Sequence, residues 1–451
     1  MLFFGQNLAK SAEILQAMII DFTVTNFCSI KEEQTFSLYA ETPGSYLIEN
    51  IVHPADDKVG VLKCAGLYGA NASGKSNLLL AFHALQFIIV GSGELKEGDK
   101  IPCYDPYLLS EANKSSPTRF EIEFFAPSAE NNQYKLIRYR YCVAFTANRI
   151  IEERLVFYPT GQQASVFDRG ISDTWQTISF GSLYKGGKKR LPFFENNTYI
   201  SKAGDSADSP QMIRNVYNYF RKKLHHFAVN ERKVKLNWFE EPSLVKKVSA
   251  LLSLVDTGIS NIRFQEKSES DDIKLPDGLP EEIKVRILKD IKNKPFFAHL
   301  ADDGMSEYFE EEKESAGTRK FFDFAPIFIE ILSNGGVLIM DELDNSMHPF
   351  MVELIIKLFN DPNVNKGNAQ LIFSTHNINL MSPELLRRDQ IWLTEKNKGS
   401  TQFFSLDDFD KKRVKPQSPF SQWYLEGRFG GIPSINYQGI VNLLMSGETN
   451  A

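Results

Sequence analysis

The chain has 451 residues, of which 42% are hydrophobic and 24% charged, and its formal net charge is −6. This composition excludes wholesale disorder and collagen-like or coiled-coil architectures, and the negative charge argues against indiscriminate coating of nucleic acid. No stretch approaches the ~18–20 uninterrupted apolar residues that cross a bilayer. The four cysteines lie far apart without a CxxC pair, as in a reduced cytoplasmic protein. We expect a soluble, cytoplasmic protein without membrane association.

The first part of the chain reads as an extension followed by β-structure. Residues 1–17 lack the apolar core of a secretory signal, and the alternating pattern that begins after Met18 indicates the start of the folded domain. Alternation of apolar residues predicts antiparallel strands, the later ones forming a meander, at 20–24, 36–38, 119–125, 136–145 and 150–158.

A glycine-rich octet, Gly69–Ser76, follows the apolar strand 62–67 and precedes a helical pattern with one buried stripe. It fits the phosphate-binding pattern GxxxxGK[ST], in which backbone amides face the phosphates, Lys75 reaches the β- and γ-oxygens and Ser76 offers its hydroxyl to Mg²⁺. We therefore predict a nucleotide site that consists of Gly69, Ala70, Asn71, Ala72, Ser73, Gly74, Lys75, Ser76 and the next residue, Asn77.

Two carboxylates follow a second apolar run, at residues 337–340. A buried strand that ends there would present Asp341 to the magnesium shell and Glu342 to the attacking water as general base. Paired acids at a strand end are common in solvated loops, and it is the upstream octet that favours the nucleotide interpretation.

Alternating strands and helices return in the last third, at 336–340, 349–360, 370–374, 390–394 and 401–404. The pattern predicts an α/β fold with a mixed sheet. The two motifs lie far apart in sequence, so we expect a large, mainly helical insertion between them. The expected domains are an extension, 1–17; the first part of the ATPase domain, 18–160; an insertion or helical lid, 161–300; and the second part of the ATPase domain, 301–451.

At this point the residues resemble ABC-type ATPases, the class that includes SMC and OLD-family proteins. Residues 314–318, Glu-Ser-Ala-Gly-Thr, look like the signature motif LSGGQ, although alanine and threonine replace a glycine and the glutamine. Residues 343–345 resemble a D-loop, and 371–377 resemble the switch strand. The resemblance implies that Ser315 and Gly317 cap the γ-phosphate bound to the opposite subunit and that His376 contacts that phosphate. A helix N-cap and a structural histidine are the alternatives. No residue is assigned to the Q-loop.

Residues 18–30, 341–349 and 424–433 are similar to the AAA-family ATPases of bacterial abortive-infection and anti-phage operons. That family implies ATP and Mg²⁺ as ligands, a homo-oligomer with at least an ATP-sandwich dimer, and control of a separately encoded effector such as a nuclease or toxin. OLD-type relatives carry a Toprim nuclease, for which too few residues follow His376. Asp407, Asp408 and Asp410 are therefore expected to form a solvated loop.

Two other functions stay open from the sequence. Basic residues outnumber acidic ones in 180–247, which would suit an SMC-like DNA repair or chromosome-maintenance ATPase, although a solvated helical face explains the same charge. The third possibility is an interaction module that binds nucleotide without hydrolysing it. A GTPase is disfavoured because no Asn-Lys pair is followed two residues later by aspartate.

Overall fold

The computed structural model describes most of the chain. The extension expected at 1–17 lies outside the described residues, which are 18–41, 46–54, 58–130, 133–227, 237–255, 257–266, 281–433 and 435–446. None of the helices in these ranges is both long and apolar enough to span a bilayer.

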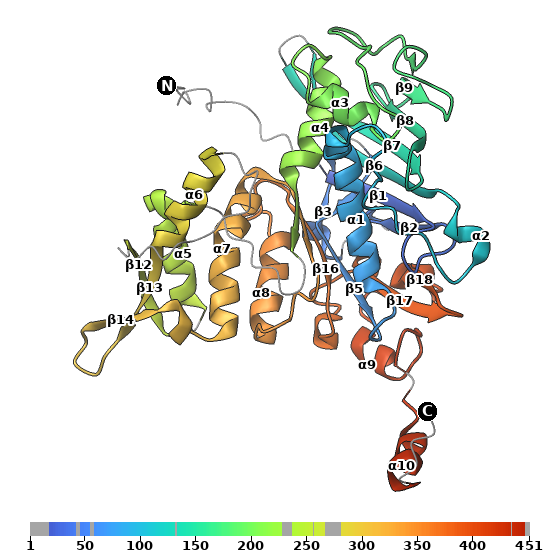
Figure 1. Ribbon diagram of the computed structural model, residues 1–451. Coiled ribbons are helices and arrows are strands. Elements are labelled where there is room, and N and C mark those ends of the chain that lie inside the picture. Colours follow the sequence, from blue (N-terminus) through green and yellow to red (C-terminus); the bar gives the residue numbers. More distant parts are fainter. Residues whose placement is uncertain are drawn as a thin grey trace.

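A six-stranded mixed sheet carries the predicted motifs (Figure 1). Its first five strands are parallel and its last strand is antiparallel to its neighbour. In spatial order the strands are β11 (Leu224–Phe227), β15 (Val337–Met340), β16 (Gln370–Ser374), β5 (Cys64–Gly69), β17 (Ile391–Asn397) and β18 (Ser400–Ser405). The predicted α/β class with a mixed sheet is confirmed.

A seven-stranded antiparallel sheet contains the predicted meander and shares a hydrophobic core with one face of the mixed sheet. In spatial order its strands are β10 (Ser179–Phe180), β9 (Ala164–Arg169), β8 (Ile150–Phe157), β7 (Gln133–Phe145), β6 (Thr118–Glu130), β1 (Met18–Thr25) and β2 (Gln34–Ser37). A further pair, β3 (Ile51–Val52) with β4 (Val61–Leu62), lies beside β1.

Helices cover both faces of the mixed sheet, so its strands are buried on both sides. In β15, Val337 and Ile339 join the core shared with α1 and the antiparallel sheet, whereas Leu338 and Met340 face the core shared with α7 and α8. This alternation follows from the two-residue period of a strand. The helices around the sheets are α1 (Lys75–Val90), α2 (Glu111–Lys114), α3 (Tyr199–Gly204), α4 (Gln211–Lys223), α7 (Ala316–Asn334), α8 (Pro349–Asn360) and α9 (Phe420–Leu425).

The segment expected as an insertion, 161–300, contains strands as well as helices. Its first part contributes β9 and β10 to the antiparallel sheet and β11 to the mixed sheet, where β11 covers the edge of β15 that would otherwise be unpaired. We propose that the inserted unit starts only after β11. This lobe consists of α5 (Pro242–Leu254), β12 (Ile259–Glu266), α6 (Glu281–Lys292), β13 (Asn293–Leu300) and β14 (Ser306–Glu310).

Aromatic side chains fasten the lobe to α7. The ring of Phe322, on α7, lies 5.4 Å from that of Trp238 and 4.9 Å from that of Phe297, which belongs to β13. Such ring contacts stabilise the junction beyond what the buried area alone contributes. The lobe and α7 therefore form one packed unit.

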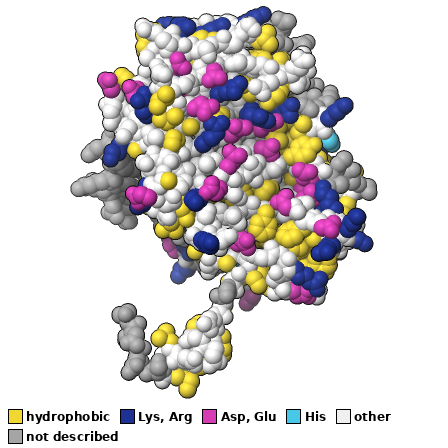
Figure 2. All heavy atoms as spheres, turned by 90° about the vertical axis from the view of Figure 1, so that its right-hand side faces the viewer, with side chains coloured by type: hydrophobic (Ala, Val, Ile, Leu, Met, Phe, Trp, Pro, Cys, Tyr) yellow, Lys and Arg dark blue, Asp and Glu magenta, His cyan; other side chains and the backbone are white. Residues whose placement is uncertain are grey.

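One helix stands apart from the rest. Helix α10 (Tyr437–Ser446) follows α9 and extends below the body of the molecule in Figure 1, and Figure 2 shows it hanging clear of the body with hydrophobic side chains on its surface.

Candidate nucleotide site

The predicted phosphate-binding loop joins β5 to α1 at the carboxyl edge of the mixed sheet. Gly69 and Gly74 adopt φ values of +148° and +112°, which are unfavourable for residues with a Cβ atom. A Cβ atom on Gly74 would also lie 2.1 Å from Thr401 Oγ1, and one on Gly69 would lie 2.4 Å from the carbonyl oxygen of Thr394. Both positions therefore require glycine.

Lys75 begins α1 and is only 6% exposed. Its Nζ donates hydrogen bonds to the carbonyl oxygens of Gly69 at 2.9 Å and Ala70 at 3.1 Å. Burial lowers the pKa of the Lys75 ammonium, and the charges of Asp341 and Glu342 oppose that shift. The cation is thus held at the loop by backbone oxygens, near two carboxylates that come from another strand.

The other residues of the predicted set differ in exposure. Ser73 is buried, whereas Ser76 is exposed at the start of α1. The amide of Asn77 donates to Ser29 Oγ at 2.5 Å, so this side chain supports the loop from the antiparallel sheet side. Exposed side chains in the loop belong to Asn71 and Ala72.

Residues from the last part of the chain brace this loop, and no local sequence pattern points to them. Ser73 Oγ lies 2.5 Å from Thr394 Oγ1, and the Thr401 hydroxyl donates to the carbonyl oxygen of Ser73 at 2.8 Å. The backbone N–H of Ala70 donates to the carbonyl oxygen of Gly431 at 3.0 Å. Strands β17 and β18 and the segment after α9 therefore fix the shape of the loop.

The paired acids follow β15 at the same edge of the sheet. Because β16 lies between β15 and β5, its last residue, Ser374, reaches both acids. The Ser374 hydroxyl donates to Asp341 Oδ1 at 2.5 Å and accepts from the backbone N–H of Glu342 at 2.8 Å. Glu342 has φ +49°, an uncommon conformation for a non-glycine residue that marks a sharp turn immediately after the strand.

The predicted D-loop and switch strand meet beside these acids. Asp344 accepts a hydrogen bond from Thr375 Oγ1 at 2.7 Å and from the backbone N–H of His376 at 3.3 Å. His376 itself is exposed at the end of β16. The structure thus brings the histidine to the carboxyl edge, with its backbone anchored and its ring open to solvent.

The predicted signature residues lie at the start of α7. Ser315 is the N-cap, and its hydroxyl accepts from a first-turn N–H at 3.1 Å, so the cap interpretation is correct for this side chain. A Cβ on Gly317 would lie 2.4 Å from the carbonyl oxygen of Ser346. Lys320 Nζ donates to the carbonyl oxygen of Asn345 at 2.8 Å. The signature therefore packs on the D-loop turn, and Ser315 stays exposed.

The donor set at the edge fits a magnesium nucleotide. Ser76 and Asp341 carry hard oxygen atoms of the kind that Mg²⁺ prefers, and this ion ordinarily takes its remaining ligands from phosphates and water. No group of three or more His, Cys, Asp or Glu side chains arranged to hold a metal occurs within the described ranges. The glycine positions and the buried Lys75 suit a polyphosphate next to that ion.

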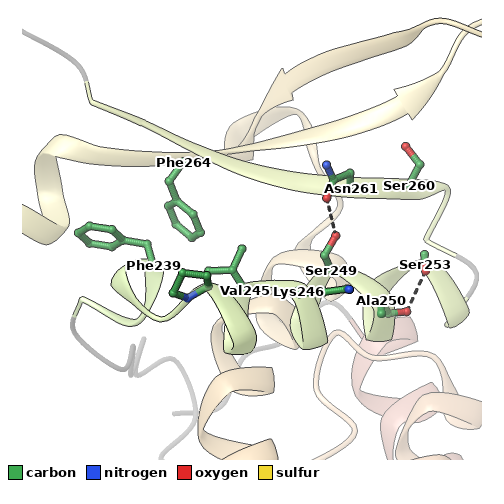
Figure 3. Close-up of a pocket in the computed structure, with 10 residues that line it drawn as sticks. Phe239, Val245, Lys246, Ser249, Ala250, Ser253, Ser260, Asn261 and Phe264 are labelled. Atoms are coloured by element: carbon green, nitrogen blue, oxygen red, sulfur yellow. Dashed lines mark hydrogen bonds between the residues drawn. The ribbon is translucent and has the colours of Figure 1, made fainter.

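A hollow lies on the lobe, between α5 and β12 (Figure 3). Phe239, Val245 and Phe264 line one part of it, and Ser249 donates a hydrogen bond to Asn261 Oδ1 at 2.9 Å in another. The described residues that line it include a single charged side chain, Lys246. The hollow therefore lacks the paired acids of the carboxyl edge.

Some basic side chains of the stretch 180–247 form hydrogen bonds within the fold. The guanidinium of Arg190 donates to the backbone carbonyl oxygen of Gln176. Lys223 Nζ donates to the carbonyl oxygen of Asn334 at 2.8 Å, at the end of α7, and burial lowers the pKa of this ammonium. Residues 228–236, within the same stretch, lie outside the described residues.

The expectation of a solvated acidic loop after β18 is wrong for one residue. Asp407 is 8% exposed and forms an ion pair with Arg388 at 2.6 Å and another with Lys411 at 3.0 Å. Asp408 caps the start of its own turn by accepting from the N–H of Ser405 at 2.8 Å. Buried carboxylates need such partners, and a sequence pattern does not reveal a cation that lies 19 residues away.

One family model matches most of the chain. Residues 64–382 match the family described as "AAA domain, putative AbiEii toxin, Type IV TA system". A search of curated proteins finds no match. Among solved structures, the chain is similar to an SMC head bound to the C-terminal winged-helix domain of ScpA, with 14% identity, 86% of this chain and 97% of that chain covered, and a TM-score of 0.37.

Two further structures are similar at comparable levels. The SMC head domain from Thermotoga maritima has 9% identity, covers 86% of this chain and 98% of its own, and has a TM-score of 0.36. The recombination mediator RecF with ATP, from the RecFOR pathway, has 12% identity, covers 83% and 94%, and has a TM-score of 0.32.

The fold and the edge of the mixed sheet define a P-loop protein of the AAA ATPase class. Because the matched family spans more than half of the chain, the chain belongs to the AAA domain family that includes the AbiEii-type proteins of type IV toxin–antitoxin systems.

Proposed function

We propose that this chain is an ATP-binding and ATP-hydrolysing regulatory subunit of a bacterial anti-phage, abortive-infection complex in the cytoplasm. In this proposal two copies hold ATP and Mg²⁺ between them. The resulting change of shape controls a separately encoded effector, such as a nuclease or another toxin. The family membership supports the ATPase part, and the resemblance of residues 18–30, 341–349 and 424–433 to defence ATPases supports the biological setting.

One observation carries the proposal. Three adjacent parallel strands, β15, β16 and β5, end at one edge with the paired acids, the switch histidine and the phosphate-binding loop. The carboxyl edge of a parallel sheet is where open α/β folds bind their ligands. This placement would give a bound nucleotide both the cation and the acids that hydrolysis requires.

The residues at this edge would have distinct roles in hydrolysis. Lys75 would neutralise phosphate charge after leaving its two carbonyl partners, and Ser76 with Asp341 would hold Mg²⁺, which screens charge on the phosphates when it is bound. Glu342 would accept the proton of the attacking water, and its turn is fixed by the bond of its N–H to Ser374. His376 would contact the terminal phosphate.

The signature supports a site shared between protomers. Ser315 is exposed, and Gly317 packs on the D-loop turn of its own chain. The N-terminus of α7, with its partial positive charge and its serine cap, therefore faces outward, where it would meet the phosphates held by a second copy.

Two single variants test the ATPase role. Glu342→Gln should keep ATP bound and accumulate the closed dimer, because only the proton acceptor is lost, whereas Lys75→Ala should bind ATP poorly. ATP binding, phosphate release and dimer mass would be measured for both. Equal ATP binding and equal assembly in the two variants, or wild-type phosphate release in either of them, would contradict the proposal.

Mixing two inactive variants tests the shared site. Lys75→Ala disables the loop and Ser315→Arg disables the signature. Random pairing of equal amounts gives about half heterodimers, each with one intact composite site, so about a quarter of wild-type turnover should return. If each chain completed its own site, the mixture would stay inactive. Thermal unfolding of each variant controls for loss of the α7 cap.

A further inference from the structure

Helix α10 presents an apolar stripe that the described residues of the chain leave largely exposed. Tyr437, Ile440, Val441 and Leu444 follow the i, i+3, i+4, i+7 spacing of one helix face. Tyr437 is 74% exposed and Leu444 is 77% exposed. Val441 is half-buried, and the other side chains described on this helix are exposed.

A helix of this length needs a packing partner. Isolated helices shorter than about 12–15 residues are marginal in water, and most helical stability in proteins comes from burying an apolar face. Helix α10 has 10 residues and includes a glycine, Gly439, which weakens it further. Its sequence therefore favours a helix that forms against another surface.

The chemistry of α10 limits what that surface can be. Its sequence, YQGIVNLLMS, contains no charged residue. Binding to nucleic acid or to an anionic membrane surface relies on Lys and Arg. The partner that this stripe fits is instead an apolar protein surface.

The base of α10 is tied to the nucleotide loop. The carbonyl oxygen of Gly431 accepts from the N–H of Ala70 at 3.0 Å and from the hydroxyl of Tyr424 at 2.9 Å. From this anchor the chain leaves the carboxyl edge of the mixed sheet and α10 extends beyond it (Figure 1). That edge carries the phosphate-binding loop and the signature, and it is the edge that faces a second copy in an ATP sandwich.

We infer that α10 is an arm that packs its apolar stripe on a second copy of this chain across the nucleotide-bound interface. The inference rests on the proposed function, because the position of the second copy comes from the shared ATP site. The Ala70–Gly431 hydrogen bond links the root of the arm to the loop that holds the phosphates, so binding of ATP and seating of the arm favour each other.

The test uses the full-length Glu342→Gln protein with ATP and Mg²⁺, which holds nucleotide without turnover. Replacing Ile440 and Leu444 together by Asp should raise the dimer dissociation constant by about tenfold or more, measured by analytical ultracentrifugation, because interface energy concentrates in a few buried apolar side chains. Binding of a fluorescent ATP analogue by the single chain should be unchanged. The control is Leu254→Asp, an equally exposed leucine (82%) on the lobe.

A photo-crosslinker at residue 444 gives an independent readout, and its expected product has twice the mass of the chain and forms with ATP. Equal dimerisation with and without the two aspartates, or crosslinks only within one chain, would overturn the role of α10 while leaving the ATP sandwich intact. Cosedimentation with phosphatidylcholine vesicles that depends on Leu444 would also overturn it. If Glu342→Gln with an intact arm does not dimerise with ATP, both the arm and the shared site are refuted.

Discussion

The hydroxyl of Ser374 donates a hydrogen bond to Asp341 at 2.5 Å, and the same oxygen accepts the N–H of Glu342 at 2.8 Å. A single side chain on β16 therefore holds the carboxylate of Asp341 and the backbone of Glu342. A hydrogen bond to a carboxylate is stronger than one between neutral groups. The strand between the two motif strands thus contributes directly to the order of the acid pair.

Ser374→Ala should lower the turnover of ATP more than it lowers ATP affinity. Loss of a hydrogen bond to a charged group costs about 1.5–3 kcal/mol, which corresponds to roughly a ten- to hundredfold fall in kcat if the whole effect is felt in the transition state. Steady-state phosphate release and equilibrium ATP binding measure the two effects. Ser374→Thr keeps the hydroxyl and should retain most of the turnover, so equal losses in both variants would contradict a positioning role.

Thr401→Val should weaken ATP binding by about tenfold, because the side chain keeps its shape but loses both hydrogen bonds of the hydroxyl that braces the loop. The Thr401 hydroxyl donates to Ser73 and lies 2.7 Å from Ser29 Oγ. Isothermal titration calorimetry gives the dissociation constant. Thr35→Val, on the exposed face of β2, is the matched control and should bind ATP as the wild type does. An unchanged affinity in Thr401→Val would show that the loop keeps its shape without this brace.

Gln370→Ala should lower the free energy of unfolding by about 3–5 kcal/mol, because it leaves buried backbone groups without partners and creates a cavity. Gln370 accepts from the N–H of Ile19 at 2.6 Å and donates to the carbonyl oxygens of Ile19 at 2.9 Å and Leu62 at 3.0 Å. These bonds join the mixed sheet to β1 and β4. Denaturant unfolding checks the value, and Gln402→Ala, which is exposed on β18, should change it by less than about 0.5 kcal/mol.

Arg388→Met should destabilise the fold by about 3–5 kcal/mol, because it leaves Asp407 buried with only Lys411 beside it. Arg413→Met removes a cation of the same type that is 87% exposed and lies 3.8 Å from Asp410, and such surface pairs contribute about 0–1 kcal/mol. Thermal and denaturant unfolding compare the two. Similar losses in both variants would show that burial of the Asp407 pair has no energetic consequence.

Local patterns predicted the elements that carry the motifs well. The helix 349–360 and the strand 370–374 begin and end where the structure has them, because Pro349 starts the helix and the strand is a short apolar run. Strand β11 was not predicted. Its four residues, LHHF, follow a helix directly, and only pairing with β15 makes them a strand. Tertiary context decides the structure of so short a segment.

The candidate site likewise contains residues that local patterns predict and residues that only the tertiary structure reveals. Motif residues sit at strand ends, so the parallel order of β15, β16 and β5 places them together, as the sequence indicated. The braces come from hydrogen bonds between distant segments: Thr401 and Ser73 are 328 residues apart, and Gln370 and Ile19 are 351 apart. Threonine and glutamine have no local pattern that announces such a partner, so these roles emerge only in three dimensions.

The aromatic contacts of Phe322 couple movement of the lobe to movement of α7. Phe322 lies seven residues after Ser315, or about 10 Å along the axis at 1.5 Å per residue. A protein that tilts the lobe would therefore rotate α7 as a rigid body. This rotation would move the exposed Ser315, at the N-terminus of α7, toward or away from the neighbouring protomer. An effector bound to the lobe could in this way change the rate of ATP hydrolysis without contacting ATP.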